Sequence, residues 1–170
     1  MNRFVLAASV VATASILGAC QSSQCCSNGK AGDPAALGTT KAAFFAGWTK
    51  SANAQFTMEP LSKVVSTTDD FLSFDGMSHG TTVIQGWKPY AAMWGPGMNG
   101  FTTASLSEAK SLRTWCEGDT AVTASLARIQ GTMPNGQTMD MLGHITLVYK
   151  WDSASGWRVV HEHMSLPVRE

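Results

Sequence analysis

The second half of the chain constrains the fold most, because it alternates long β-type segments with short hairpin-type turns. The segments are rich in Thr, Val, Ile, Trp and Tyr, which antiparallel strands favour. They span residues 102–116, 120–132, 138–151 and 157–166. The turns between them, at residues 117–119, 134–136 and 152–156, contain the Gly, Asn, Asp and Pro that hairpin connections use. The pattern therefore predicts a meander of four long antiparallel strands.

Helical signals precede this meander. Asp33-Pro34 is typical of a helix start, with Asp as the N-cap and Pro as the first helical residue. The apolar residues that share one face of this helix are Leu37, Phe44 and Trp48. We expect a second short helix to begin at Glu59-Pro60, and residues 69–75 suit a short strand followed by a turn.

Aromatic residues at helical spacing predict a third helix, which contains Trp87, Tyr90 and Trp94. Pro89 fits in its first turn, and Gly95-Pro96-Gly97 is expected to end it. Helices followed by a strand meander indicate the α+β class, with the helices on one face of a curved sheet.

The last predicted strand carries the clearest resemblance to a known family. Residues 156–165 read G-W-R-V-V-H-E-H-M-S. This is similar to the closing G-W-x-hydrophobic-hydrophobic-H-x-H-x-S segment of the SnoaL-like group, which belongs to the nuclear transport factor 2 superfamily together with ketosteroid isomerase. The resemblance runs from about Pro34 to Leu166. Further points of likeness are Asp69-Asp70, Asp75-Gly76 and Gly86.

The resemblance implies a cone-shaped α+β domain. Three N-terminal helices would pack on a strongly curved, mainly antiparallel sheet and enclose an apolar cavity. Relatives often dimerise through the outer face of the sheet, so a homodimer is expected. The resemblance identifies no reaction, because the superfamily holds enzymes, binding modules and assembly domains.

The first twenty residues have the layout of a secretion signal. A short basic start with Arg3 precedes an uncharged apolar run at 4–17, which is too short to span a bilayer comfortably. Leu17-Gly18-Ala19-Cys20 resembles the bacterial lipobox, in which the Cys is lipidated. We expect a signal peptide at 1–19, a polar tether at 20–32 and a cone domain at 33–170. An ordinary signal peptide or an uncleaved anchor is the alternative.

This interpretation places the protein in the bacterial cell envelope, where lipid on Cys20 would anchor it to a membrane. The domain would face the periplasm, and Gln21 favours the outer membrane. Cys25 and Cys26 lie in the tether, whereas Cys116 lies near a strand end, where a buried free thiol is expected. A bridge from the tether to Cys116 is the alternative in an oxidising compartment.

Composition and motifs exclude several classes of function. Twelve Lys and Arg balance twelve Asp and Glu without a basic block, so nucleic acid is not expected as a partner. The sequence lacks the G-x-S-x-G, H-E-x-x-H, P-loop and dinucleotide-binding motifs. We therefore expect no cofactor.

Asp75 is the first candidate for catalysis. The spacing of Asp69-Asp70 and Asp75 is similar to the ketosteroid isomerase stretch whose last Asp is the general base. At the mouth of an apolar cavity its pKa would be raised by desolvation. The alternative is an ordinary Asp-Gly turn after a strand. The oxyanion donors of that isomerase, a Tyr on the first helix and an Asp on a central strand, have no counterparts at the corresponding positions.

His161 and His163 are two residues apart on a strand and therefore share one face. They could form a cavity acid–base group helped by His144 on the neighbouring strand, with His163 as the catalytic residue. The alternative is a structural role in the sheet or at a subunit contact. We expect no metal, because a zinc site would need a third ligand that only the fold could supply.

Tyr90 and Trp94 on the third helix could line the cavity, although an aromatic stripe also suits plain core. We expect Tyr90, Trp94, His144 and His161 to contact the ligand. The sequence thus predicts a membrane-tethered domain that binds a small apolar or aromatic molecule, with proton transfer as its expected chemistry. A non-catalytic assembly module is the alternative.

Overall fold

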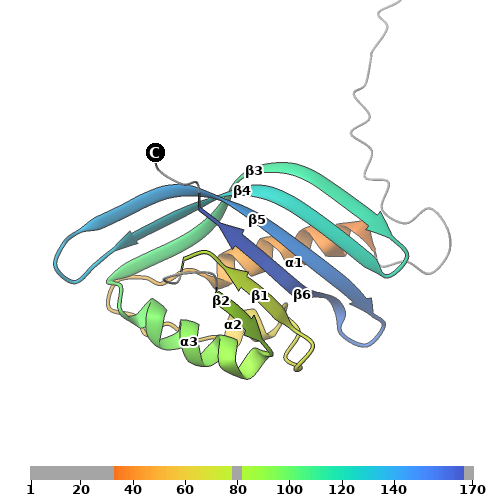
Figure 1. Ribbon diagram of the computed structural model, residues 1–170, viewed down its shortest axis with the longest axis horizontal. Helices are drawn as coiled ribbons and strands as arrows, with labels where there is room; N and C mark the ends of the chain where they lie inside the picture. The colour runs from red at the N-terminus through yellow and green to blue at the C-terminus, as the bar shows by residue number, and fades with distance from the viewer. Residues whose placement is uncertain (1–32, 78–81, 167–170) are drawn as a thin grey trace, which may run out of the picture.

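One six-stranded sheet carries the helices on one face (Figure 1). The computed structural model describes residues 33–77 and 82–166. The elements in chain order are α1 (Pro34–Gly47), α2 (Glu59–Ser62), β1 (Leu72–Asp75), β2 (Thr82–Gln85), α3 (Trp87–Asn99), β3 (Thr103–Glu117), β4 (Thr120–Thr132), β5 (Thr138–Asp152) and β6 (Gly156–Ser165). The strand order is β2-β1-β6-β5-β4-β3, in which β1 and β6 run parallel and the other neighbours run antiparallel.

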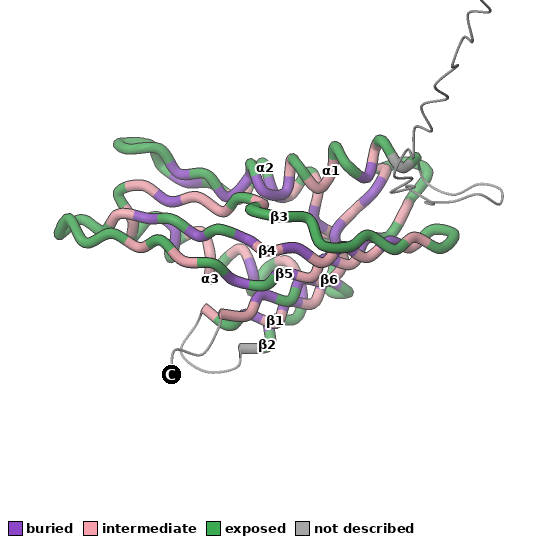
Figure 2. The backbone as a smooth tube through the Cα atoms, turned by 90° about the horizontal axis from the view of Figure 1, so that it is seen from above, coloured by how far each residue is buried: buried purple, intermediate pink, exposed green. Residues whose placement is uncertain are grey.

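Helix α1 begins at the residue that its capping signal predicts. The Asp33 side chain accepts a hydrogen bond from the Ala35 N–H at 2.9 Å, and Pro34 is the first helical residue. The predicted apolar face is buried at Leu37, Phe44 and Trp48. Figure 2 shows that α1 lies along one face of the sheet, so this apolar stripe packs into the core.

The predicted meander is confirmed. Strands β3 to β6 begin and end within one residue of the predicted segments, and each is joined to the next by a hairpin. Gly118 and Gly136 adopt positive φ angles of 58° and 83° in two of these turns. Side chains other than Gly rarely adopt this conformation, so the glycines fix where the strands reverse.

The arrangement of the helices differs from the expected one. The α+β class and the mainly antiparallel sheet are found, but α3 follows β1 and β2 instead of standing in an N-terminal group of three. Helix α2 is a single turn, and strand β2 was not expected. A four-residue edge strand is too short to show a clear period of two, which explains why the sequence did not reveal it.

Helix α3 also continues past the proline that was expected to end it. Pro96 lies inside the helix, which runs on to Asn99. The Asn99 side chain accepts from the Phe56 N–H at 2.8 Å and donates to the oxygens of Phe56 at 3.0 Å and Gly95 at 2.9 Å. The two bonds with Phe56 connect the last turn of α3 to the segment before α2. They compensate for the backbone hydrogen bond that Pro96 cannot donate.

A β-bulge interrupts β6 in the middle of the strand. Tyr149 on β5 is opposite Val159 and Val148 is opposite His161, so Val160 is an extra residue. Trp157 and Val159 face the core before the bulge, and Glu162 and Met164 face it afterwards. The bulge therefore changes which residues of the strand point inward.

The described residues bear on the question of a membrane-spanning helix and on one of the cysteines. None of the described helices is both long and apolar enough to cross a membrane. Cys116 is disulfide-bonded, so the expected free thiol is corrected. The predicted signal peptide, tether and lipidation site at Cys20 also lie outside them.

Candidate functional site

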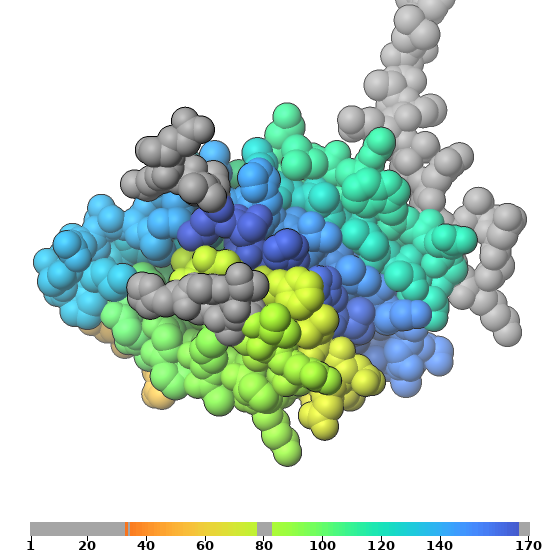
Figure 3. Space-filling model, viewed as in Figure 1, coloured from red at the N-terminus to blue at the C-terminus, as the bar shows by residue number. Residues whose placement is uncertain are grey.

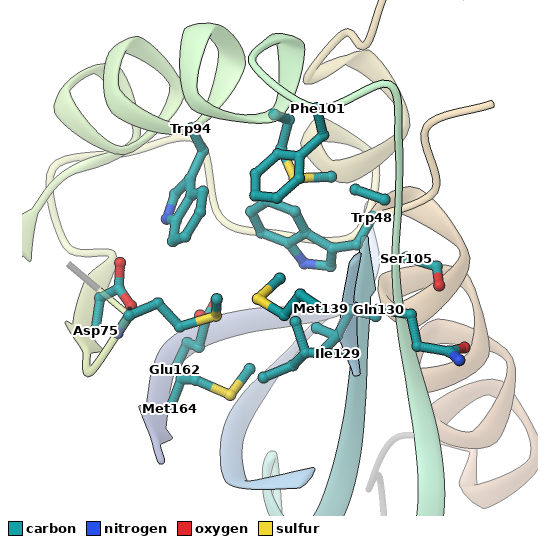
Figure 4. A pocket seen from close by; sticks show the side chains of 14 residues that line it. Trp48, Asp75, Trp94, Phe101, Ser105, Ile129, Gln130, Met139, Glu162 and Met164 are labelled. Atoms are coloured by element: carbon teal, nitrogen blue, oxygen red, sulfur yellow. Dashed lines mark hydrogen bonds between the residues drawn. The ribbon is translucent and has the colours of Figure 1, made fainter. Parts of the chain in front are cut away.

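A pocket opens between α3, the end of α1 and the inner face of the sheet (Figure 4). Its volume is about 70 Å³. A single buried water needs about 10–15 Å³ on this scale, so the space suits a few waters or a small ring. The lining residues are Trp48, Asp75, Met77, Trp94, Met98, Phe101, Ala104, Ser105, Leu106, Ile129, Gln130, Met139, Glu162 and Met164.

Two carboxyl groups reach this pocket from neighbouring parallel strands. Glu162 on β6 is 3% exposed, and Asp75 at the end of β1 is 2% exposed. In the register of the two strands, Asp75 is opposite Met164, two residues beyond Glu162. Because side chains two apart on a strand share a face, both carboxyl groups point to the same side of the sheet.

Tyr90 on α3 completes a polar cluster with Glu162. Its hydroxyl donates a hydrogen bond of 2.5 Å to Glu162 Oε2 in the buried core. Burial raises the pKa of Tyr90 well above its usual value, and the charge of Glu162 raises it further. The phenol therefore stays protonated and serves as a fixed donor to the carboxylate.

The ionisation of Glu162 is shifted to neutral pH. Burial raises the pKa of Glu162 to about 7; the hydrogen bond from Tyr90 lowers it and the nearby charge of Asp75 raises it. A carboxyl group with this pKa can both accept and release a proton near neutral pH, which suits general acid–base chemistry.

Asp75 is both part of an Asp-Gly turn and a carboxyl group that lines the pocket, the two roles that its sequence context left open. Its Oδ1 accepts a hydrogen bond from the Met77 N–H at 2.8 Å, which is the local geometry of an Asp-Gly turn. The same side chain is buried and lines the pocket. The turn thus positions the carboxyl group toward the cavity.

Most of the remaining residues that line the pocket are apolar and adaptable. Four methionines contribute to it, and their unbranched side chains can change shape at low cost. Trp48 and Trp94 lie edge to face, with ring centroids 5.3 Å apart. Such a wall favours a flat apolar ligand whose outline the methionines can follow.

The histidines that sequence reasoning placed in the cavity lie on the other face of the sheet. His161 and His163 do share one face, where both rings contact Phe74 with centroids 5.0 and 5.8 Å apart. His163 and His144 are exposed. The Nδ1 atom of His161 is 2.9 Å from the Leu72 carbonyl oxygen. None of these three residues is among those that line the pocket.

The bulge at Val160 is the physical reason for this difference. Without it, the period of two that begins at Trp157 and Val159 would place His161 and His163 inside. With it, Glu162 faces the pocket, and sequence reasoning missed this residue. The sequence does contain one signal. Met164 is apolar and lies two residues after Glu162, so the two side chains share one face of the strand. Val159 and Val160 are adjacent apolar residues, which interrupts the alternation of a regular strand.

The other sequence candidates lie close to the pocket. Trp94 lines it and Tyr90 is fully buried behind Glu162, to which it donates. Within residues 33–77 and 82–166, no three His, Cys, Asp or Glu side chains gather in a way that could hold a metal ion.

A second polar cluster lies between α1 and the sheet. Glu108 on β3 accepts from Lys41 Nζ on α1 at 3.0 Å and from Ser125 Oγ on β4 at 2.5 Å. Each member of this cluster has its partner within the fold. It therefore connects α1 to the sheet and is separate from the pocket chemistry.

Comparison with protein families now identifies the fold. Residues 42–169 match the model of the SnoaL-like domain. The chain belongs to the SnoaL-like domain family. The comparison with curated protein sequences finds no match.

Solved structures share the fold of this SnoaL-like domain at low sequence identity. A proposed dehydratase of the NTF2-like family from Streptomyces avermitilis is 17% identical, with a TM-score of 0.63 over 79% of this chain and 96% of that chain. A proposed ketosteroid isomerase from Shewanella frigidimarina is 17% identical, with a TM-score of 0.58 over 76% and 94%. The CaMKII hub of S. rosetta is 15% identical, with a TM-score of 0.58 over 78% and 95%. These similarities establish the fold.

Proposed function

We propose that this SnoaL-like domain binds a small, largely apolar molecule in its pocket and transfers a proton with Glu162. The observation that carries the proposal is a deeply buried carboxyl group on an apolar pocket, with a tyrosine donor on its oxygen and a pKa of about 7. In the proposed step, the Glu162 carboxylate takes a proton from a carbon next to a carbonyl and returns it to the same molecule. Glu162 thus replaces Asp75 and His163 as the proposed base.

Binding is tested by filling the pocket. Leu106→Trp adds volume to a side chain that lines the pocket, and Leu142→Trp makes the same change on the outer face of the sheet. We would measure the thermal midpoint of the full chain with neutral steroids, aromatic polyketide-like compounds, terpenoids and fatty acids. A ligand at about a hundred times its Kd adds roughly 2.7 kcal/mol, a shift of several degrees. We expect Leu106→Trp to lose this shift and Leu142→Trp to keep it.

Proton transfer is tested separately with a bound ketone in D₂O. We expect deuterium to enter at the carbon next to the carbonyl, with the rate measured by mass spectrometry. Glu162→Gln should lower this rate at least a hundredfold, the usual contribution of a general base, and leave binding intact. Equal exchange rates in the variant and the parent would contradict the role of Glu162.

The anchoring of the domain belongs to the same proposal. We infer from the lipobox-like end of the first twenty residues that Cys20 is lipidated and holds the domain at the periplasmic face of an envelope membrane, with the outer membrane favoured. Metabolic labelling with palmitate should mark the parent chain and leave Cys20→Ser unlabelled. Cys25→Ser is the matched control and should retain the label.

An assembly module is the second candidate function. The observation in its favour is the outer face of the sheet, where Val83, Trp115 and Leu142 are 58%, 53% and 49% exposed. None of the described helices covers this face, which is turned to the viewer in Figure 3. Pairing of two such faces would bury these side chains in a homodimer. The two functions are compatible, because they use opposite faces of the sheet.

A further inference from the structure

We propose that Trp48 determines which molecules this pocket accepts. Its indole N–H donates a hydrogen bond to an acceptor oxygen of the carbonyl class on an uncharged, otherwise apolar ligand. This inference rests on the proposed function of the pocket and names its substrate class. It assigns the donor to the C-terminal end of α1, where the sequence offers no tyrosine.

The indole N–H of Trp48 is a buried hydrogen-bond donor. Trp48 is 5% exposed, and its Nε1 atom has no hydrogen-bond partner within the part of the chain that the structure describes. Buried N–H groups in proteins are normally paired, so an unpaired one calls for an explanation. Trp48 lines the pocket, and Figure 4 shows its ring nitrogen on the side turned to the cavity.

The Trp48 ring is held in this orientation by its neighbours. It stacks on Phe56 at a centroid distance of 6.0 Å and an interplanar angle of 14°. Tyr90 and Trp94 contact it edge to face at 6.0 and 5.3 Å. Its backbone forms the C-cap of α1. A donor fixed in this way is preorganised for an acceptor on the ligand.

The charges around the pocket decide the class of that acceptor. The described residues that line it include the two acids Asp75 and Glu162 and none of Lys, Arg or His. An anionic acceptor such as a carboxylate would be repelled, because like charges in a buried site strongly oppose each other. A neutral oxygen, such as that of a carbonyl group, accepts from Trp48 without this cost.

An amine ligand is the competing possibility, and it fits less well. A cation would pair with the acids but would leave the indole N–H unsatisfied, which costs free energy. A carbonyl compound can interact with Trp48 and with Glu162 at the same time, since these two residues lie on different walls of the pocket in Figure 4. Its oxygen would bind Trp48, and its activated C–H would be available to Glu162.

Access to the N–H requires one side chain to move. The Trp48 nitrogen is buried in the structure, and Met139 lies beside the indole ring in Figure 4. Methionine has three rotatable side-chain bonds and repacks at low cost. A ligand of the proposed class therefore displaces the end of Met139 as it binds.

The test uses four probes that share one ring system: 1-indanone, indane, the cation of 1-aminoindane and the anion of indane-1-carboxylic acid. Dissociation constants are measured by titration calorimetry on the full chain, the Trp48→Phe variant and the Trp94→Phe variant. Trp94 is the matched control, because it lines the same pocket and its Nε1 also has no hydrogen-bond partner among the described residues. The carbonyl preference is the Kd of indane divided by the Kd of 1-indanone.

We expect this preference to fall by roughly threefold to tenfold in Trp48→Phe, the effect of one neutral hydrogen bond, and to stay unchanged in Trp94→Phe. The anion should not bind. A preference that is unchanged in Trp48→Phe, or that falls in Trp94→Phe instead, overturns the assignment of Trp48. Tighter binding of the cation than of the ketone to the parent chain overturns the carbonyl class.

A spectrum of the parent chain tests the same contact without any substitution. Each of the six tryptophans gives one indole N–H signal in a ¹⁵N-correlated spectrum. We expect 1-indanone, but not indane, to move the Trp48 signal downfield. If both ring compounds bind and this signal stays in place, the hydrogen bond is refuted while the proposed binding function stands. If none of the four probes binds the folded chain, both proposals fail together.

Discussion

Glu162 gives the pocket its chemical character, because its surroundings set the pH at which it holds a proton. Burial opposes the charged form, and the charge of Asp75 acts in the same direction. The hydrogen bond from Tyr90 acts in the opposite direction and limits the rise of the pKa to about 7. The balance of these three effects keeps both protonation states available near neutral pH.

The raised pKa predicts that stability depends on pH through Glu162. The folded chain binds the proton more tightly than the unfolded chain, so this stability is present below about pH 4.5 and is lost as the pH rises through about 7. A rise from 4.5 to about 7 corresponds to about 3 kcal/mol. Urea unfolding at pH 4.5 and 8 should show this loss in the parent and not in Glu162→Gln. Parallel pH profiles of the two proteins would contradict it.

Removal of the Tyr90 hydroxyl should change the titration of Glu162. In Tyr90→Phe the hydrogen bond that lowers the pKa of Glu162 is lost, so we expect this pKa to rise above about 7. The ¹³C chemical shift of the Glu162 carboxyl carbon measures the midpoint. Tyr149→Phe is the control, because Tyr149 is equally buried but lies beside Thr123 instead of Glu162. A midpoint that moves equally in both variants would refute the specific effect.

At the scale of the elements, the sequence predicts the long strands well and the site less well. Strands β3 to β6 follow from runs of β-formers between turn residues, which act locally. The bulge at Val160 depends instead on how β6 fits against β5, and no turn residue marks it. This one extra residue decides whether His163 or Glu162 enters the pocket. The candidate base was therefore missed although the strand was found.

The end of α3 is a second case in which tertiary contacts override a local signal. Gly95-Pro96-Gly97 disfavours helix, and the hydrogen bonds of Asn99 maintain the last turn. We expect Asn99→Ala to lower the free energy of unfolding by about 1–3 kcal/mol. Asn99→Asp keeps the acceptor for the Phe56 N–H and loses both donated bonds. Its free energy of unfolding should therefore lie between those of the parent and Asn99→Ala. Chemical denaturation measures all three proteins; an Asn99→Ala variant as stable as the parent would refute this explanation.

At the scale of the molecule, the curved sheet separates two kinds of surface. Its inner face holds the core, the pocket and the buried acids, and the helices cover it (Figure 2). Its outer face carries the three histidines together with exposed apolar side chains. Because neighbouring residues of a strand alternate between these faces, changes on one face leave the other largely intact. Ligand binding and assembly can therefore be tested by separate substitutions.

The last prediction concerns assembly through the outer face. Leu142 is half-exposed on β5, and a two-fold axis across this face would bury it in both subunits. We expect Leu142→Glu to weaken self-association at least tenfold, because the change places a charge of each subunit in the buried interface. Gln55→Glu adds the same charge at an exposed position in the loop between α1 and α2, and it should leave association unchanged. Sedimentation velocity over a range of concentrations measures the three proteins. A parent chain that stays monomeric throughout, or a dimer that Leu142→Glu does not weaken, would exclude this face as the interface and leave the pocket as the functional surface of the domain.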